Sequence, residues 1–188
     1  MKLSKIVAGL VVLALPLSGA LAQRDDQFAV GIGGGVVVPA GLASDHHKLG
    51  PQGTLSLGIG MVDSPFGIRF DGMYAGLPDR GGSVAGVDQG SARLFVLTAN
   101  GVFNIYGSNT RLYAVTGIGG HWYTPDGTGA SSRNDFALQT GLGIWLPFAN
   151  VFLEAKWMNL YRMLPDRETG LSGKRSGQLY PITLGIIF

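Results

Sequence analysis

The last eleven residues of the chain decide its fold: Gln178-Leu-Tyr-Pro-Ile-Thr-Leu-Gly-Ile-Ile-Phe188. Apolar or aromatic side chains occupy every second position, namely Tyr180, Ile182, Leu184, Ile186 and Phe188. Successive side chains of a strand point to opposite faces, so this spacing predicts a strand with one continuous apolar face. At roughly 3.3 Å per residue that face is about 26 Å long, and strand tilt shortens its height to about 20 Å. Such a height is close to that of the apolar band of a transmembrane β-barrel.

Seven earlier segments alternate in the same way. Together with the last one they cover residues 28–39, 52–62, 66–77, 92–106, 111–124, 136–148, 151–163 and 178–188. Three connections are tight turns, at 63–65, 107–110 and 149–150, and the four between them are long, at 40–51, 78–91, 125–135 and 164–177. Short periplasmic turns and longer surface loops are typical of outer-membrane barrels. The sequence therefore predicts an all-β fold, an eight-stranded antiparallel up-and-down transmembrane β-barrel.

Alternation alone leaves open which face lies inside, because a soluble lipocalin-like carrier would turn its apolar face inward. Glycine distinguishes the two arrangements. Six strand glycines lie on the less apolar parity: Gly31, Gly33, Gly58, Gly60, Gly141 and Gly143. Glycine weakens a strand unless a close approach requires it, and the crowded lumen of an eight-stranded barrel does require it. We therefore expect small and charged side chains in the lumen and the apolar face against lipid.

Aromatic side chains are expected near both ends of this face, as in the girdles of membrane barrels. The periplasmic set is Phe28, Phe66, Phe103, Phe148 and Phe188, and the outer set is Tyr74, Phe136, Trp157, Tyr161 and Tyr180. Strand 111–124 stays ambiguous, because two apolar sets alternate along it. Either Leu112, Ile118 and Trp122 or Tyr113, Val115 and Tyr123 face lipid.

The start of the chain has the form of an export signal. Lys2 and Lys5 precede an apolar run at 6–15, and small residues follow up to Ala22. This pattern predicts a signal peptide at 1–22 and a single barrel domain at 23–188. The leader holds two of the 14 basic residues and none of the 12 acidic ones, so the mature chain is formally neutral and no nucleic-acid partner is expected. With no cysteine, disulfide and thiolate chemistry are excluded.

The terminal strand resembles the C-terminal signature of bacterial outer-membrane proteins, with alternate apolar residues before a final aromatic, here Phe188. The resemblance implies recognition by periplasmic chaperones and by the barrel-assembly machinery. With eight strands and this loop pattern, residues 23–188 resemble the OmpA/OmpX-type small barrel domains. OmpA itself carries a peptidoglycan-binding domain after its barrel, and since none follows here, we expect no wall anchoring through such a domain.

Charged residues on the lumen parity form the most site-like feature of the sequence. Arg69 and Asp71 lie four and six residues beyond the turn at 63–65, and Glu154 and Lys156 lie equally far beyond the turn at 149–150. The third and seventh strands face each other across an eight-stranded barrel, so we expect the four charges at one depth. Two bases and two acids can pair there, as buried charges must. Arg162 is expected higher in the same lumen. We predict a structural plug, with a gated ion path as the alternative.

An enzyme is the second functional alternative, since some small barrels modify lipid A with a His, a Ser and an acid. The histidines are His46, His47 and His121, and no serine stands two residues from His121. Ser131 and Ser132 in the next loop stay open as partners. A nucleophile needs a positioned base, and the sequence provides no clear pair. We therefore predict no catalytic residues.

No metal or cofactor site is predicted either. Asp45, His46 and His47 are adjacent, and three neighbouring loop residues seldom form a closed site, so we expect a solvated loop. Basic residues in or near the long loops are candidates for contact with lipopolysaccharide phosphates. They are Arg80, Arg93, Arg167, Lys174 and Arg175.

These features predict a monomeric, non-enzymatic barrel of the cell outer membrane with a plugged lumen. We expect it to support envelope integrity or adhesion through its four long surface loops. Its expected partners are outer-membrane lipids, lipopolysaccharide, the periplasmic chaperones and the assembly machinery.

Overall fold

The computed structural model describes residues 28–60, 65–81, 83–84, 87–88, 90–106, 110–127, 132–164 and 175–188. Eight strands form the main sheet: β1 Phe28–Ala40, β2 Gly50–Ile59, β3 Phe66–Leu77, β6 Ala92–Tyr106, β7 Arg111–Pro125, β8 Arg133–Leu146, β9 Val151–Leu164 and β10 Arg175–Ile187. The smaller elements are α2 Leu42–His46, β4 Ser83–Val84, β5 Val87–Asp88 and the 3₁₀ turn Pro147–Ala149. The predicted signal peptide lies outside the described residues.

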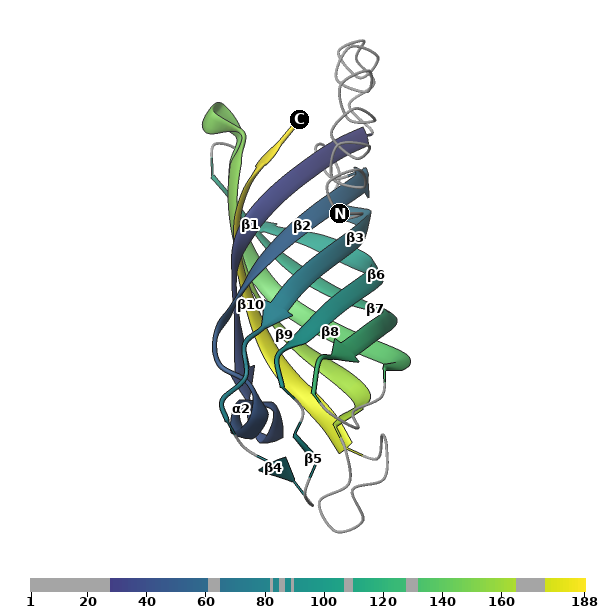
Figure 1. The fold of residues 1–188 in the computed structure, drawn as a ribbon. Coiled ribbons are helices and arrows are strands. Elements are labelled where there is room, and N and C mark those ends of the chain that lie inside the picture. Colours follow the sequence, from purple (N-terminus) through teal and green to yellow (C-terminus); the bar gives the residue numbers. More distant parts are fainter. Residues whose placement is uncertain are drawn as a thin grey trace, which may run out of the picture.

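The eight strands close into a barrel in the order β1-β10-β9-β8-β7-β6-β3-β2, and every neighbouring pair is antiparallel (Figure 1). β4 and β5 form a separate two-stranded sheet near α2, at the end of the barrel away from the C-terminus (Figure 1). The predicted eight-stranded up-and-down barrel is confirmed. Among the described residues, no helix is both long and apolar enough to cross a membrane.

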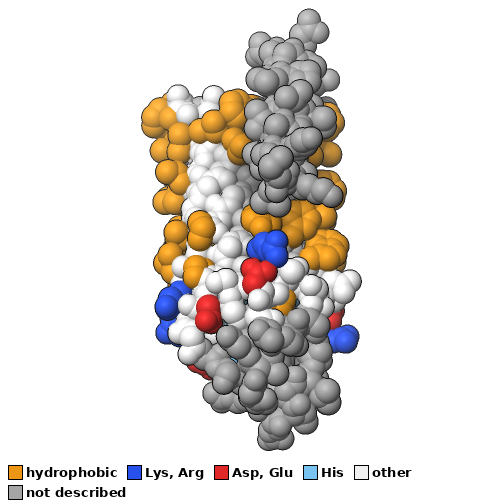
Figure 2. All heavy atoms as spheres, in the orientation of Figure 1, with side chains coloured by type: hydrophobic (Ala, Val, Ile, Leu, Met, Phe, Trp, Pro, Cys, Tyr) orange, Lys and Arg blue, Asp and Glu red, His pale blue; other side chains and the backbone are white. Residues whose placement is uncertain are grey.

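The wall has the predicted parity. On β10, Ile182 and Leu184 are 41% and 59% exposed, while Thr183 between them is 1% exposed. On β7 the structure resolves the ambiguity. The exposed residues are Leu112, Ile118 and Trp122, and the buried ones are Tyr113, Val115 and Tyr123. Figure 2 shows hydrophobic side chains around the barrel wall, with the charged side chains of this face toward the loop end. An apolar exterior on a closed barrel is the arrangement that lipid requires.

Exposed aromatic side chains lie in pairs on this outer wall. Phe66 and Phe103 pack with ring centroids 5.1 Å apart near the short turns. Phe136 and Tyr161 pack at 5.8 Å toward the loops. Both pairs belong to the two predicted girdles, so the aromatic residues interact across neighbouring strands.

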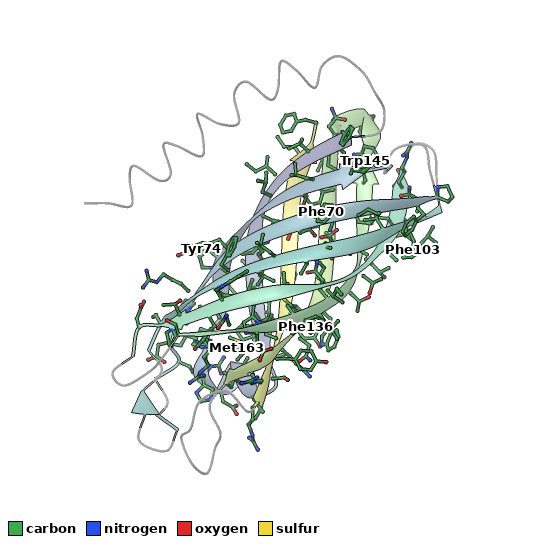
Figure 3. The ribbon with its side chains drawn as sticks, turned by 90° about the vertical axis from the view of Figure 1, so that its right-hand side faces the viewer. Phe70, Tyr74, Phe103, Phe136, Trp145 and Met163 are labelled. Carbon is green, nitrogen blue, oxygen red and sulfur yellow. The ribbon has the colours of Figure 1, made fainter. Side chains whose placement is uncertain are left out.

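The lumen is filled in layers. An apolar cluster near the short turns contains Val102, Tyr113, Val115, Trp145 and Phe152. A larger apolar cluster fills the loop half and includes Met73, Met158, Met163 and Leu179. Trp145 and Met163 accordingly lie toward opposite ends of the barrel in Figure 3. Polar and charged residues occupy the space between these clusters.

Lumen glycines provide room for these side chains. A Cβ atom on Gly143 would overlap the ring of Tyr113, and one on Gly185 would lie 2.5 Å from the ring of Phe152. A larger residue at either position would displace an aromatic side chain of the inner cluster. Of the six glycines predicted on the lumen parity, Gly33, Gly141 and Gly143 are crowded in this way, whereas Gly60 has a φ of 70° and only ordinary contacts.

Candidate functional site in the barrel lumen

Two opposite strands carry the charged centre of the lumen. β3 and β9 are four places apart in the ring of eight strands, so they face each other across the barrel. β3 provides Arg69 and Asp71, and β9 provides Glu154 and Lys156. All four side chains are at most 5% exposed. The structure therefore brings together the four residues that were placed by counting from the turns.

The four side chains form a closed ring of alternating charge, which we call the charge ring. Arg69 contacts both acids, with Nε 2.8 Å from Asp71 Oδ1 and Nη1 2.8 Å from Glu154 Oε2. Lys156 Nζ also contacts both, at 3.2 Å from Asp71 Oδ2 and 2.9 Å from Glu154 Oε1. Each charge has two opposite neighbours and the sum is zero, which offsets the cost of removing the groups from water.

Neutral polar groups complete the coordination of the acids. Tyr113 Oη donates to Glu154 Oε2 at 2.9 Å, and Asn100 Nδ2 donates to Asp71 Oδ2 at 3.2 Å. Gln139 Nε2 in turn donates to Asn100 Oδ1 at 2.5 Å. Strand parity places Asn100 and Gln139 on the lumen face but predicts no role for them, and Tyr113 lies on the strand that stayed ambiguous.

A second polar group lies beside the charge ring. Gln52 Nε2 donates to Thr183 Oγ1 at 2.7 Å, and Thr54 Oγ1 donates to Gln52 Oε1 at 2.7 Å. Thr183 is the register partner of Glu154 on β9, so this group adjoins the charges. Together the two groups place hydrogen-bonding side chains from seven of the eight strands, all except β1, in the middle layer of the barrel.

Arg162 does not lie in the lumen, and this part of the prediction is wrong. Its side chain is 72% exposed, and its Nε lies 3.2 Å from Asp135 Oδ2. The cause is a bulge: the register between β9 and β10 shifts here, and Arg162 has a φ of 53°. Tyr161 and Arg162 therefore both face outward, while Met163 and the next residue both face inward. The register advances four residues on β9 for two on β10, so β9 holds two extra residues, and its parity is broken at Arg162 and Met163 and restored at the next residue.

The histidines occupy the outer mouth of the barrel. His46 and His47 are 7% and 0% exposed, so the expectation of a solvated loop is wrong for both. The loop folds into α2, and His47 Nε2 lies 2.8 Å from Tyr123 Oη inside the barrel. His121 is also fully buried, with Nδ1 3.2 Å from the carbonyl oxygen of Phe136.

The structure tests the candidate catalytic and metal sites of these histidines only over the described residues. Ser132 is exposed and Ser131 lies outside the described residues. Within the described part of the chain, no group of three His, Cys, Asp or Glu side chains is arranged to hold a metal ion. Of the candidate basic loop residues, Arg80, Arg93 and Arg175 are described, and Arg167 and Lys174 are not.

The terminal strand closes the barrel. Phe188 N donates to the carbonyl oxygen of Val30 at 2.8 Å, and Val30 N donates back to Phe188 O at 3.1 Å. The side chain of Phe188 is 66% exposed. Tyr180, Ile182, Leu184 and Ile186 face outward as well. The terminal signature therefore lies along the seam where the first and last strands meet.

Comparison with solved structures places this geometry among known folds. Neisserial surface protein A matches with a TM-score of 0.53 and 18% identity, over 86% of this chain and 97% of that protein. The chain therefore shares the eight-stranded β-barrel fold of this protein. Scans against family models and against curated proteins find no match to the sequence.

Two further solved barrels align over the same share of this chain, 86%, with lower scores. Ail, the attachment invasion locus protein of Yersinia pestis, solved with the heparin analogue sucrose octasulfate, has 17% identity, 97% coverage and a TM-score of 0.47. A major outer membrane protein from Thermus thermophilus has 14% identity, 98% coverage and a TM-score of 0.48.

Proposed function

We propose that the barrel is a non-enzymatic outer-membrane protein with a plugged lumen, which supports envelope integrity or adhesion through its surface loops. The observation that carries the plug is the charge ring, because it spans the lumen from β3 to β9 with every charge paired. A permeating ion would have to break these pairs. Apolar side chains occupy the lumen on both sides of the ring, so an ion would also have to give up its hydration to reach it.

The outer rim is proposed to contact lipopolysaccharide. Arg93 pairs with Asp126 at 2.8 Å and its side chain is 53% exposed, and Arg162 pairs with Asp135 as described above. Such exposed pairs contribute little stability, so a phosphate can compete for the guanidinium groups. Arginine binds phosphate through two parallel hydrogen bonds. The bulge at Arg162 supports this role, because it turns the guanidinium from the lumen toward the headgroups.

The seam strand β10 is proposed to be the segment that periplasmic chaperones and the assembly machinery recognise. Its outward apolar side chains and Phe188 are accessible before the barrel closes. A display role for the loops is supported by the fold shared with Neisserial surface protein A, which is by its name a surface protein.

Deleting the gene and complementing it tests the function. The deletion strain should become more sensitive to detergent, or lose surface binding, and the wild-type gene should restore the property. Lipid A from cells with and without the protein should have the same mass spectrum. Modified lipid A would favour the enzyme alternative, and an unchanged envelope and unchanged binding would contradict the proposed role.

A further inference from the structure

The first loop, residues 41–49, covers the outer mouth of the barrel, and we call it the lid. Its helix α2 packs against β1 and β10 at the loop end (Figure 1). Ala43 is fully buried and belongs to the same apolar cluster as Val37, Leu77 and Leu179. The lid therefore seals the apolar half of the lumen.

The lid is tied to the second loop by backbone contacts. Lys48 N donates to the carbonyl oxygen of Pro78, and Arg80 N donates to that of His46, both at 2.9 Å. His47 forms an isolated bridge with Asp79. These contacts join the backbones of two surface loops, and the side chains that the lid buries add to them.

His47 puts a titratable side chain into the barrel and onto a strand residue. It is fully buried, its Nε2 lies 2.8 Å from Tyr123 Oη, and the two rings meet edge to face at 5.8 Å. Tyr123 is fully buried as well. A neutral imidazole fits this contact with either tautomer, whereas an imidazolium would place a charge beside an apolar cluster.

The charged neighbours of His47 come from three directions. On the lid, the ring of His46 lies 6.4 Å away. Asp79 of the second loop interacts with His47 electrostatically. Tyr123 contacts His47 from the barrel wall and interacts in turn with Arg133 of β8. Burial and the repulsion of His46 lower the pKa of His47 to about 4, while Asp79 and the carbonyl group of Pro78 oppose this only in part.

We propose that the lid is released by acid: protonation of His47 leaves a charge buried in the apolar mouth of the barrel, and α2 lifts so that the imidazolium reaches water. A lifted lid returns His47 to water, where its pKa is about 6.5. The free-energy advantage of the closed lid over the released lid is therefore complete above pH 6.5. The closed lid loses about tenfold in population per pH unit between pH 6.5 and 4, on the order of 100-fold in all.

Release would uncover the apolar side chains beneath the lid without opening a pore, because the charge ring lies deeper in the lumen. The inference thus goes beyond the proposed plug. Whether the lid is released by acid does not depend on whether the barrel conducts ions.

The absence of cysteine from the chain provides the test. Ala43→Cys places a single thiol on the buried face of the lid, and Leu49→Cys places one at a position that is 55% exposed, as the control for the pH dependence of the reaction itself. The full mature chain would be folded in lipid vesicles and labelled with a charged thiosulfonate reagent. The ratio of the two labelling rates reports lid opening. From pH 7.5 to 5 this ratio should rise on the order of tenfold or more.

Two further variants assign the response to one histidine. His47→Gln in both backgrounds should make the ratio independent of pH, whether the lid is then tight or loose. His121→Gln, which changes another fully buried histidine, should leave the rise in place. A ratio that is flat with His47 present, or that rises equally with His47→Gln, would overturn the proposal.

Discussion

At the scale of single residues, the charge ring explains why an arginine and a lysine side chain are stable inside the barrel. Arg69 and Lys156 each touch both Asp71 and Glu154, so no charge depends on one partner. Removing a single member leaves its neighbours short of a counter-charge rather than removing an isolated interaction. The contributions of the four residues to the free energy of unfolding should therefore be strongly coupled.

Glu154→Ala tests this coupling. We expect it to lower the free energy of unfolding by about 3–5 kcal/mol, or less where water enters, because it leaves two cations facing one acid. Adding Arg69→Ala or Lys156→Ala should cost less than the sum of the single changes in both cycles. Urea unfolding in vesicles measures each value.

The exposed pair Arg93–Asp126 is the matched control for these cycles. Its coupling energy should stay below about 1 kcal/mol, because both side chains are half exposed to solvent. Additive energies in both cycles of Glu154 would show that the four charges do not act as one network.

Arg162 carries a different residue-scale prediction, which concerns its backbone. Arg162→Gly and Arg162→Val both remove the exposed ion pair with Asp135. Only valine places a branched Cβ at a φ of 53°, so the Arg162→Val protein should be less stable than the Arg162→Gly protein by at least about 1 kcal/mol. Equal stabilities of the two variants in urea would mean that the bulge does not form there.

At the scale of elements, β10 shows how far the sequence determines the fold. Its alternation predicted the lipid face correctly, because period-2 spacing leaves only two possible orientations and glycine selected one. The same reasoning was insufficient for β7, where both parities are apolar and where Tyr113 turns inward with its hydroxyl on Glu154 of β9. It failed at Arg162, where the bulge breaks the period.

The lipid face of β10 can be tested with a charge. Ile182→Arg should lower stability by about 2–4 kcal/mol if the residue lies near the midplane of the bilayer, and by less near an interface. Leu49→Arg, at a comparably exposed position in the lid, should change it by less than about 0.5 kcal/mol. Unfolding in vesicles measures both, and similar costs would contradict the assignment of the lipid face.

Phe188 tests the proposed assembly signal on the same element. Its backbone pairs with Val30, so deleting it also removes two hydrogen bonds of the seam. Phe188→Ala keeps these bonds and removes only the aromatic ring, and Phe188→Tyr keeps both. We expect the level in the outer membrane to fall for the deletion and for Phe188→Ala, and to be retained for Phe188→Tyr. Wild-type levels of Phe188→Ala would exclude the ring as the signal.

At the scale of the whole molecule, the layers of the lumen follow from contacts between distant strands. The four ring charges could be placed from the sequence, because equal distances from two turns on opposite strands give equal depth. His46 and His47 could not, since their burial depends on a loop that folds into α2 and on Tyr123, 76 residues from His47. Local composition contains no signal for such a contact.

The central claim is that the charge ring closes the barrel, and conductance in planar bilayers tests it most directly. The wild-type barrel, inserted as the folded full chain, should be nearly silent at neutral pH. Glu154→Ala should be less stable and show brief leak events, because an unpaired cation no longer holds the two sides of the lumen together. A large, steady wild-type conductance would show an open path through the ring and would contradict the plug.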